Sequence, residues 1–252
     1  AANDNTKVNV TATLTDTEVR GQYTVGDTAW KADNATHNFT TGINNGAGTM
    51  TVSGGVVRNA SGNGIANSSG ATVNIGAVYI HNNNGNGISN AGTGNITGNA
   101  KIGFSAYKSL SYTADTKAGT DSGYVTSKNG DDAVKNTGTM TISGAVRLYT
   151  EGKPAISNSG TFTFQQNADV CLLAKTDGNV IENSSTMTAE AEDTTDKNAK
   201  PACTIFGNAA SSTGKICGIS NTGTLNWGGV INGTYQIGKN GRESDKNNPD
   251  RK

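Results

Sequence analysis

The sequence predicts an all-β protein that forms a single-domain parallel β-solenoid, and three observations predict it. One phrase recurs along the chain, and its clearest copy, residues 134–148, reads aliphatic-x-Asn-x-Gly-Thr-apolar-x-apolar-x-Gly-x-Val-x-apolar. The copies recur at intervals in the twenties, and their apolar residues alternate as they do in β-strands. The 252 residues include 34 Gly and only 33% apolar residues, which suits short strands around a thin core with frequent tight turns.

An aliphatic-x-Asn signature marks each copy of the repeat. Successive aliphatic residues are separated by 22, 23, 46, 22, 25 and 38 positions. We interpret the step of 46 as two coils with one degenerate coil between them, and the step of 38 as either one coil with an insertion or two irregular coils. The spacing therefore predicts about eight or nine coils of 22–25 residues, each made of three short strands. The signatures are Ile43/Asn45, Ile65/Asn67, Ile88/Asn90, Val134/Asn136, Ile156/Asn158, Ile181/Asn183 and Ile219/Asn221.

Most positions of the repeat have a structural explanation. Alternate apolar residues are expected to point inward, and Asn and Gly suit the corners between strands. Because stacked coils lie about 4.8 Å apart, equivalent Asn side chains are expected to hydrogen-bond along the stack. The expected structural ladder comprises Asn45, Asn67, Asn90, Asn136, Asn158, Asn183 and Asn221. The expected inward columns are Met50, Val73, Met140, Phe162, Met187 and Leu225; Val52, Ile75, Ile142, Phe164 and Trp227; and Val56, Val78, Val146 and Val170.

Residues 1–41 do not match the repeat. Residues 7–20 alternate as one long strand, and residues 21–30 follow as a second strand. We favour a cap on the open end of the solenoid, because such an end exposes unpaired backbone groups. The alternative is an arm that pairs with a neighbouring subunit, and Val8, Val10 and Leu14 are then the candidates for self-assembly.

Residues 42–238 are assigned to the solenoid. Two stretches without the repeat, near residues 104–128 and 191–202, are expected to leave the coil as loops. Loops on a rigid scaffold are frequent binding sites. Residues 239–252 form a polar C-terminal tail.

Composition excludes several kinds of partner. The formal net charge is zero and no basic block lies outside the C-terminal tail, so no nucleic-acid partner is expected. No apolar stretch approaches the ~20 residues of a membrane span. The opening Ala1-Ala2-Asn3-Asp4 resembles a mature end left by signal cleavage, which favours a secreted or cell-surface protein. Cys203 and Cys217 either close a disulfide loop or, with Cys171, are small buried hydrophobes; neither His pairs with them as a metal site, and no metal or cofactor is expected.

The repeat resembles right-handed parallel β-helix proteins of the pectin-lyase-like class, above all the Asn/Gly/Thr-rich autotransporter passengers and adhesins of bacterial surfaces. The resemblance covers about residues 42–238. It implies an extracellular, non-enzymatic protein whose partner is a surface glycan, a surface protein or a second copy of itself. The same fold hosts polysaccharide lyases and hydrolases, so carbohydrate chemistry must also be considered.

The best candidates for carbohydrate binding lie around the first insertion. Gly130-Asp131-Asp132 looks like the paired-carboxylate segment of galacturonan hydrolases, although the Asn-Thr-Asp, Gly-His-Gly and Arg-Ile-Lys segments of that family are absent. We therefore interpret Asp131 and Asp132 first as turn residues. Tyr107, Tyr112 and Tyr124 either stack on sugars or pack the insertion onto the coil. All five residues are retained as candidate ligand-binding residues, and no catalytic residue is assigned.

A repeated Thr-x-Thr pattern predicts two outward ladders on one face. Regular Thr ladders resemble those of ice-binding proteins, but Asn replaces the second Thr in three of seven copies, and Thr is a good exposed strand residue in any sheet. We therefore expect a surface structural protein, either an adhesin or a self-assembling fibre subunit. The alternative is a polysaccharide-binding or polysaccharide-cleaving solenoid, with ice binding third. The complete Thr-x-Thr copies begin at Thr49, Thr139, Thr161 and Thr186.

Overall fold

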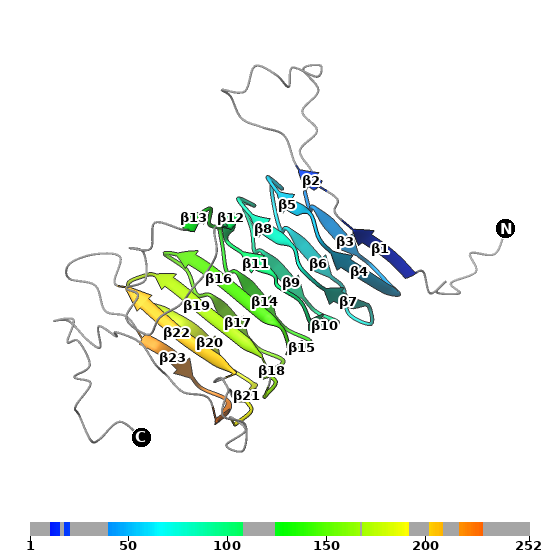
Figure 1. Ribbon diagram of the computed structural model, residues 1–252. Coiled ribbons are helices and arrows are strands. Elements are labelled where there is room, and N and C mark those ends of the chain that lie inside the picture. Colours follow the sequence, from blue (N-terminus) through cyan, green and yellow to red (C-terminus); the bar gives the residue numbers. More distant parts are fainter. Residues whose placement is uncertain are drawn as a thin grey trace, which may run out of the picture.

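The structure, a computed structural model, describes residues 11–15, 18–20, 40–107, 124–166, 168–191, 202–208 and 217–228. These residues form short β-strands and no helix. The strands stack into an elongated parallel solenoid, so the predicted fold class is confirmed (Figure 1). Among the described residues, the three parallel sheets, here named A, B and C, contain eight, seven and seven strands.

Each complete coil visits the sheets in the order C, A, B, and every neighbouring pair in these sheets is parallel. Sheet A contains β1 (Thr11–Thr15), β4 (Thr49–Ser53), β7 (Thr72–Ile75), β10 (Thr93–Ile96), β15 (Thr139–Ile142), β18 (Thr161–Phe164), β21 (Thr186–Ala189) and β24 (Thr224–Trp227). Sheet B contains β2 (Glu18–Arg20), β5 (Val56–Arg58), β8 (Tyr79–His81), β11 (Lys101–Ile102), β16 (Ala145–Glu151), β19 (Asp169–Lys175) and β22 (Cys203–Asn208). Sheet C contains β3 (Ile43–Asn45), β6 (Ile65–Asn67), β9 (Ile88–Asn90), β14 (Val134–Asn136), β17 (Ile156–Asn158), β20 (Asn179–Asn183) and β23 (Cys217–Asn221).

The strand register corrects one interpretation of the spacing and decides another. Ile88 pairs directly with Val134, so the step of 46 is one coil with an insertion and not two coils. An antiparallel pair of strands, β12 (Phe104–Tyr107) and β13 (Tyr124–Thr126), lies at the two ends of the insertion. Ile181 likewise pairs with Ile219, so the step of 38 is one coil with an insertion. The expected count of eight or nine coils treated the step of 46 as two coils.

The core consists of columns of apolar side chains that run along the stack. The two predicted columns of sheet A are aligned by the register, and their central members are fully buried. Gly94 stands in the first column, and a Cβ added there would lie 2.7 Å from Cε of Met140. Met140 of the next coil therefore fills the space that Gly94 leaves, as a flexible thioether can.

The prediction that Val56 of sheet B points inward is wrong. Val56 is half-buried and pairs with Tyr79, whereas Val57 is 1% exposed and pairs with the buried Ile80. Two consecutive glycines with positive φ, Gly54 and Gly55, form the corner before β5. Such a corner needs residues without a Cβ, and the strand that leaves it turns Val57 inward.

A continuous ladder of amide side chains runs inside sheet C, where the repeat predicts it. In each coil but the last described one, the Asn of the signature donates from Nδ2 to Oδ1 of the Asn in the next coil. The same Nδ2 donates to the backbone carbonyl of a Thr in that next coil, so the buried amides keep hydrogen-bond partners. The Nδ2–Oδ1 distances are 2.8 Å for Asn45–Asn67, 2.7 Å for Asn67–Asn90, 2.8 Å for Asn90–Asn136, 2.8 Å for Asn136–Asn158, 2.7 Å for Asn158–Asn183 and 2.6 Å for Asn183–Asn221.

The described N-terminal strands continue the solenoid. β1 pairs in parallel with β4, which places Leu14 opposite Val52, and β2 pairs in parallel with β5. The expected single strand over residues 7–20 is therefore two strands that belong to different sheets. Val8, Val10, the expected second strand over residues 21–30 and the C-terminal tail lie outside the described residues.

A small apolar cluster lies on the outer side of sheet B, where the insertion leaves the coil. Phe104 of β12 packs against Cys171, Leu173 and Tyr149, and the rings of Phe104 and Tyr149 have centroids 5.8 Å apart. The described cysteines are all free thiols: Cys171 and Cys203 are buried and Cys217 is exposed. Burial is the main cause that raises the pKa of the Cys203 thiol well above its ordinary value.

Candidate functional site

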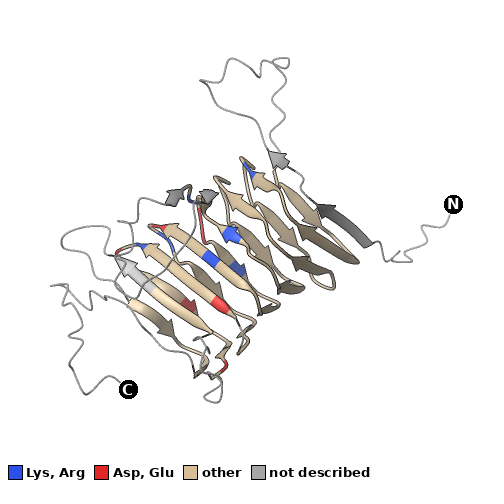
Figure 2. Ribbon diagram, in the orientation of Figure 1, with Lys and Arg blue, Asp and Glu red and all other residues tan. Residues whose placement is uncertain are grey.

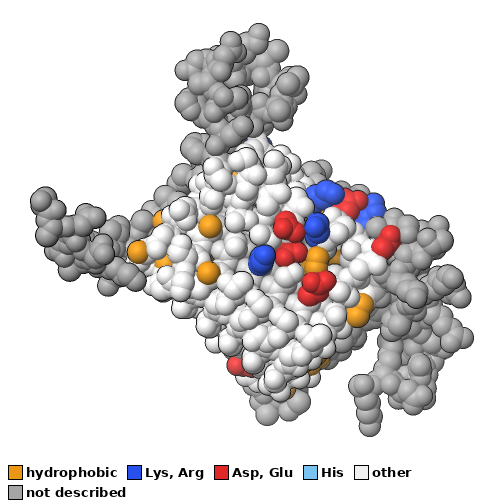
Figure 3. Space-filling view, turned by 180° about the vertical axis from the view of Figure 1, so that it is seen from behind, with side chains coloured by type: hydrophobic (Ala, Val, Ile, Leu, Met, Phe, Trp, Pro, Cys, Tyr) orange, Lys and Arg blue, Asp and Glu red, His pale blue; other side chains and the backbone are white. Residues whose placement is uncertain are grey.

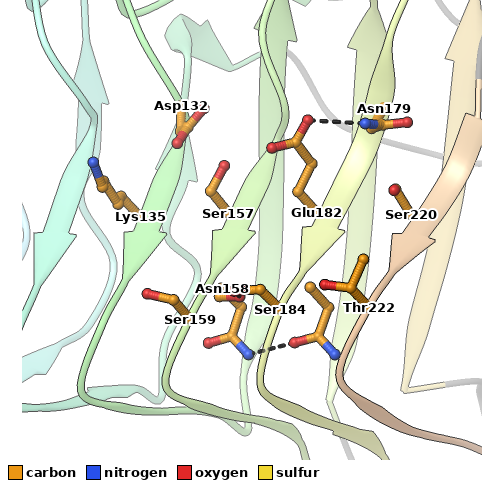
Figure 4. Close-up of a pocket in the computed structure, with 11 residues that line it drawn as sticks. Asp132, Lys135, Ser157, Asn158, Ser159, Asn179, Glu182, Ser184, Ser220 and Thr222 are labelled. Carbon is orange, nitrogen blue, oxygen red and sulfur yellow. Dashed lines mark hydrogen bonds between the residues drawn. The ribbon is translucent and has the colours of Figure 1, made fainter.

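The candidate site is an open groove of about 470 Å³ on the outer face of sheet C. It crosses β14, β17, β20 and β23, so four successive coils contribute side chains to it (Figure 4). The middle residue of the aliphatic-x-Asn signature forms its central row, because the residues on either side point into the core. By register this row consists of Lys135, Ser157, Glu182 and Ser220.

Two further rows line the groove along its edges. On one side lie hydroxyl side chains that directly follow the ladder Asn of each coil; on the other side lie residues that precede the strands (Figure 4). The backbone of the hydroxyl row is held by bonds between coils, such as Ser184 N to Asn158 O at 2.8 Å. The rows comprise Ser159, Ser184 and Thr222 on one side and Asp132 and Asn179 on the other, and the ladder residues Asn158 and Asn183 complete the lining.

Asp132 is the most buried ionisable group of the groove, with 7% of its surface exposed. The backbone carbonyls of Asn63, Asn86 and Asp132 make equivalent bonds in successive coils, so Asp132 replaces an amide residue at this corner. Burial raises the pKa of Asp132 to about 6, because a buried carboxylate loses hydration. A hydrogen bond from Ser157 lowers this pKa in part, and the negative charge of Asp131 raises it.

Glu182 is the second carboxylate of the groove, and it is exposed. Asn179 donates from Nδ2 to Oε1 of Glu182 at 2.8 Å, which orients the carboxylate over the strand (Figure 4). The side chains of Asp132 and Glu182 flank Ser157, and the ammonium of Lys135 lies on the neighbouring strand. The groove thus combines two carboxylates and one ammonium with hydroxyl and amide groups. The charge of Glu182 acts on Asp132, which is a further, smaller cause of its raised pKa.

The two neighbouring aspartates lie in different surroundings. Asp132 lines the groove, whereas Asp131 forms an ion pair with Lys153, with Oδ1 and Nζ 3.7 Å apart. Asp131 is not among the residues that line the groove. The side chain that bonds to Asp132 is instead Ser157. The second carboxylate of the groove is Glu182, 50 positions further along the chain, which the sequence interpretation did not single out.

Two of the candidate tyrosines belong to the strands of the first insertion. Tyr107 and Tyr124 are paired across the antiparallel strands β12 and β13. Tyr112 lies outside the described residues. Lys135, Ser157 and Glu182 were missed because they occupy the variable middle position of the signature. That position is the available signal, since the flanking residues are assigned inward and the middle one must face out.

The outer face of sheet A carries the predicted Thr ladders. By register, one outward column is Thr in seven strands, from Thr49 to Thr224, and Thr11 of β1 is paired with Thr49. The second column has Asn at positions 74, 95 and 226, and Asn95 donates to Asn74 at 2.9 Å. Charged side chains are few on the stack (Figure 2), and most of those visible from behind gather in one region of a largely uncharged surface (Figure 3).

Within the described part of the chain, no cluster of His, Cys, Asp and Glu side chains is large enough to hold a metal ion. The same residues include no helix with the length and apolarity needed to cross a membrane. Comparison of the chain with protein-family models, with curated proteins and with solved structures found no match. The case for function therefore depends on the solenoid and its groove.

Proposed function

We propose that the chain is a non-enzymatic structural protein of the cell surface or extracellular space, an adhesin that presents a binding face on a rigid solenoid. The observation that carries this proposal is the uninterrupted amide ladder of sheet C in a stack of three continuous sheets. Each coil is bonded to its neighbours, so equivalent outward residues keep a fixed spacing along the stack. Repeated rows of this kind suit contact with an extended partner. The resemblance to β-helix passengers of bacterial surfaces supports the same function.

The adjacent aspartates that suggested polysaccharide cleavage give this alternative little support. Glycoside hydrolysis needs two carboxyl groups on either side of one bond. Asp131 is paired with Lys153 on one side of its corner, while Asp132 lines the groove with Ser157. The adjacent pair therefore does not make a dyad and gives cleavage no support. The function that we propose is binding, with Asp132 and Glu182 as the two carboxylates of the groove.

Surface location and adhesion test the proposal together. Antibodies raised against the purified chain should label intact cells of the producing organism, and a protease added to those cells should release the antigen. Beads coated with the chain should attach to cell or glycan surfaces more than beads coated with a chemically denatured sample. Antigen that is detected only after lysis, or equal attachment of both kinds of bead, would overturn the proposal.

A second candidate is end-to-end assembly into a fibre. The inward residues of the last described coil, Ile219, Leu225 and Trp227, are only partly buried, although their column neighbours Ile181 and Met187 are fully buried. An end of this kind favours stacking on another edge. Electron microscopy of native material distinguishes the two candidates. If fibres are present, deleting residues 1–20 should abolish them without unfolding the chain, and fibres that persist would exclude the N-terminal strands as the joint.

A further inference from the structure

We propose that the groove on sheet C binds a neutral polysaccharide that lies across the strands, with successive sugar units on successive coils. This inference rests on the proposed function, because it names the ligand of the binding face. The groove crosses β14, β17, β20 and β23 and is lined only by polar side chains. An extended ligand that follows the central row therefore meets Lys135, Ser157, Glu182 and Ser220 in order (Figure 4).

The spacing of the rows suits a chain of sugars. Parallel strands lie about 4.8 Å apart, and this distance is close to the length of one pyranose unit in an extended glycan. A polymer that crosses the strands therefore meets an equivalent set of positions at each step. Each coil offers one residue of the central row, and three of the four also offer the hydroxyl residue that follows the ladder Asn, as with Ser157 and Ser159.

The chemistry of the lining also suits sugar hydroxyls. Carboxylate oxygens accept hydrogen bonds from hydroxyl groups, and Ser, Thr and Asn side chains both donate and accept. The Glu182 carboxylate is already oriented by Asn179 at 2.8 Å. Asp132 is more than nine-tenths buried yet lines the groove, so its carboxyl group is a fixed acceptor or donor for a bound hydroxyl. Ligand-binding sites owe their specificity to a few polar groups placed in this way.

Charge and shape argue against other occupants. The lining has two carboxylates, Asp132 and Glu182, against one ammonium, Lys135, so a phosphate or polyanionic chain is repelled. Peptides are commonly captured by strand addition at a sheet edge or by apolar pockets, whereas this groove lies on a sheet face and has no apolar lining residue. An uncharged, hydroxyl-rich chain is not repelled by the carboxylates and needs neither a sheet edge nor an apolar pocket.

The test measures polysaccharide binding by the full chain and by two variants. Native affinity electrophoresis in gels that contain galactomannan, xyloglucan or dextran should retard the chain with at least one of these polymers, and gels with polygalacturonate or heparin should not. Ser157→Tyr places a bulky ring in the centre of the groove and should weaken binding at least tenfold. The matched control is Thr163→Tyr, because Thr163 belongs to the same coil and faces outward on sheet A. Glu182→Gln removes one carboxylate and should weaken binding several-fold.

The outcomes distinguish failure of the groove's proposed ligand from failure of the adhesin proposal. Binding that Ser157→Tyr leaves unchanged, or that Thr163→Tyr weakens equally, would place the ligand elsewhere and overturn the inference. Retardation only by the anionic polymers would overturn it as well. If coated beads adhere to cells but none of the neutral polymers retards the chain, the adhesin proposal stands and the neutral ligand is wrong. Circular dichroism and thermal melting of each variant establish that a loss of binding is not a loss of folding.

Discussion

The buried Asn residues show how single side chains specify the stack. A buried amide is unfavourable unless it is hydrogen-bonded. Here each Nδ2 finds an oxygen in the following coil, and Asn136, which is fully buried, both accepts from Asn90 and donates to Asn158. A shift in the register of one coil would leave these groups unpaired. The ladder therefore selects one alignment of the coils as well as stabilising it.

Removing one rung tests this role. Asn136→Ala takes the acceptor from Asn90 and the ladder donor from Asn158, both of which are buried. We expect the free energy of unfolding to fall by about 1–3 kcal/mol. The control is Asn221→Ala at the exposed last rung, where we expect a loss below about 1 kcal/mol because solvent replaces the amide. Urea denaturation followed by circular dichroism measures both variants, and equal losses would contradict the buried-ladder explanation.

The carboxyl group of Asp132 predicts a specific pH dependence. Its pKa is raised from 3.8 to about 6 in the folded chain, so the folded state holds this proton more tightly than the unfolded state. Below about pH 4 the group is protonated in both states and carries no penalty; as the pH rises through 6, the folded state alone must ionise a buried group. Relative to Asp132→Asn, the wild-type chain should therefore lose stability between pH 4 and 6.5.

The size of this difference is modest. After a discount for solvent screening we expect about 1–2 kcal/mol at pH 7. Asn is a suitable replacement because Asn63 and Asn86 occupy the equivalent position in preceding coils. Urea titrations of both proteins at half-unit pH steps measure the difference in their free energies of unfolding. The contributions of the other carboxyl groups are common to both proteins and cancel. Curves that remain parallel from pH 4 to 7 would show that Asp132 is ionised normally.

At the scale of elements, the corners decide how closely coils stack. At the corner that leads from sheet C to sheet A, Gly138 and Gly160 lie directly above one another. A Cβ added to Gly160 would lie 2.0 Å from the carbonyl oxygen of Gly138, and backbone cannot yield as a flexible side chain can. The glycine is thus required by the distance between coils.

Substitution at this corner separates packing from backbone propensity. Gly160→Ala should destabilise the chain by about 2 kcal/mol or more, since neighbouring coils must separate to admit the methyl group. Gly46→Ala, with no atom within 4 Å of its added Cβ, should be neutral or slightly stabilising. Thermal melting of the two variants provides the comparison. A neutral Gly160→Ala variant would mean that the corner is looser than the structure shows.

The elements also show what the sequence could and could not predict. Sheet C and its ladder were predictable because the aliphatic-x-Asn signature is local and repeats in every coil. The step between Ile88 and Val134 was not, since a count of residues cannot distinguish a degenerate coil from an insertion; only the pairing of β9 with β14 does so. The groove escaped prediction for a related reason. Its side chains occupy variable positions, and Asp132, Ser157 and Glu182 come together only when three successive coils are stacked.

The whole molecule behaves as a one-dimensional stack, in which a coil is stabilised chiefly by its two neighbours. Inner coils have both, as the bonds from Val134 N to Ala155 O at 2.9 Å and from Ala155 N to Val180 O at 2.8 Å illustrate. The last described coil pairs on one side, through bonds such as Thr224 N to Ser185 O at 2.7 Å, and its inward residues are only partly buried. Hydrogen bonds of similar length thus lie in coils of different expected stability.

Native-state hydrogen exchange tests whether stability follows position in the stack. Amides of β14 and β17 should exchange at least about tenfold more slowly than those of β24, because opening an inner coil breaks two interfaces and opening the last breaks one. Asn136→Ala should then accelerate exchange in β14 and its neighbours β9 and β17 more than in β24. Uniform protection from β3 to β24 that falls equally in all strands of the variant would instead show that the solenoid opens as a single cooperative unit. In that case the ladder couples the coils more strongly than nearest-neighbour contacts alone require.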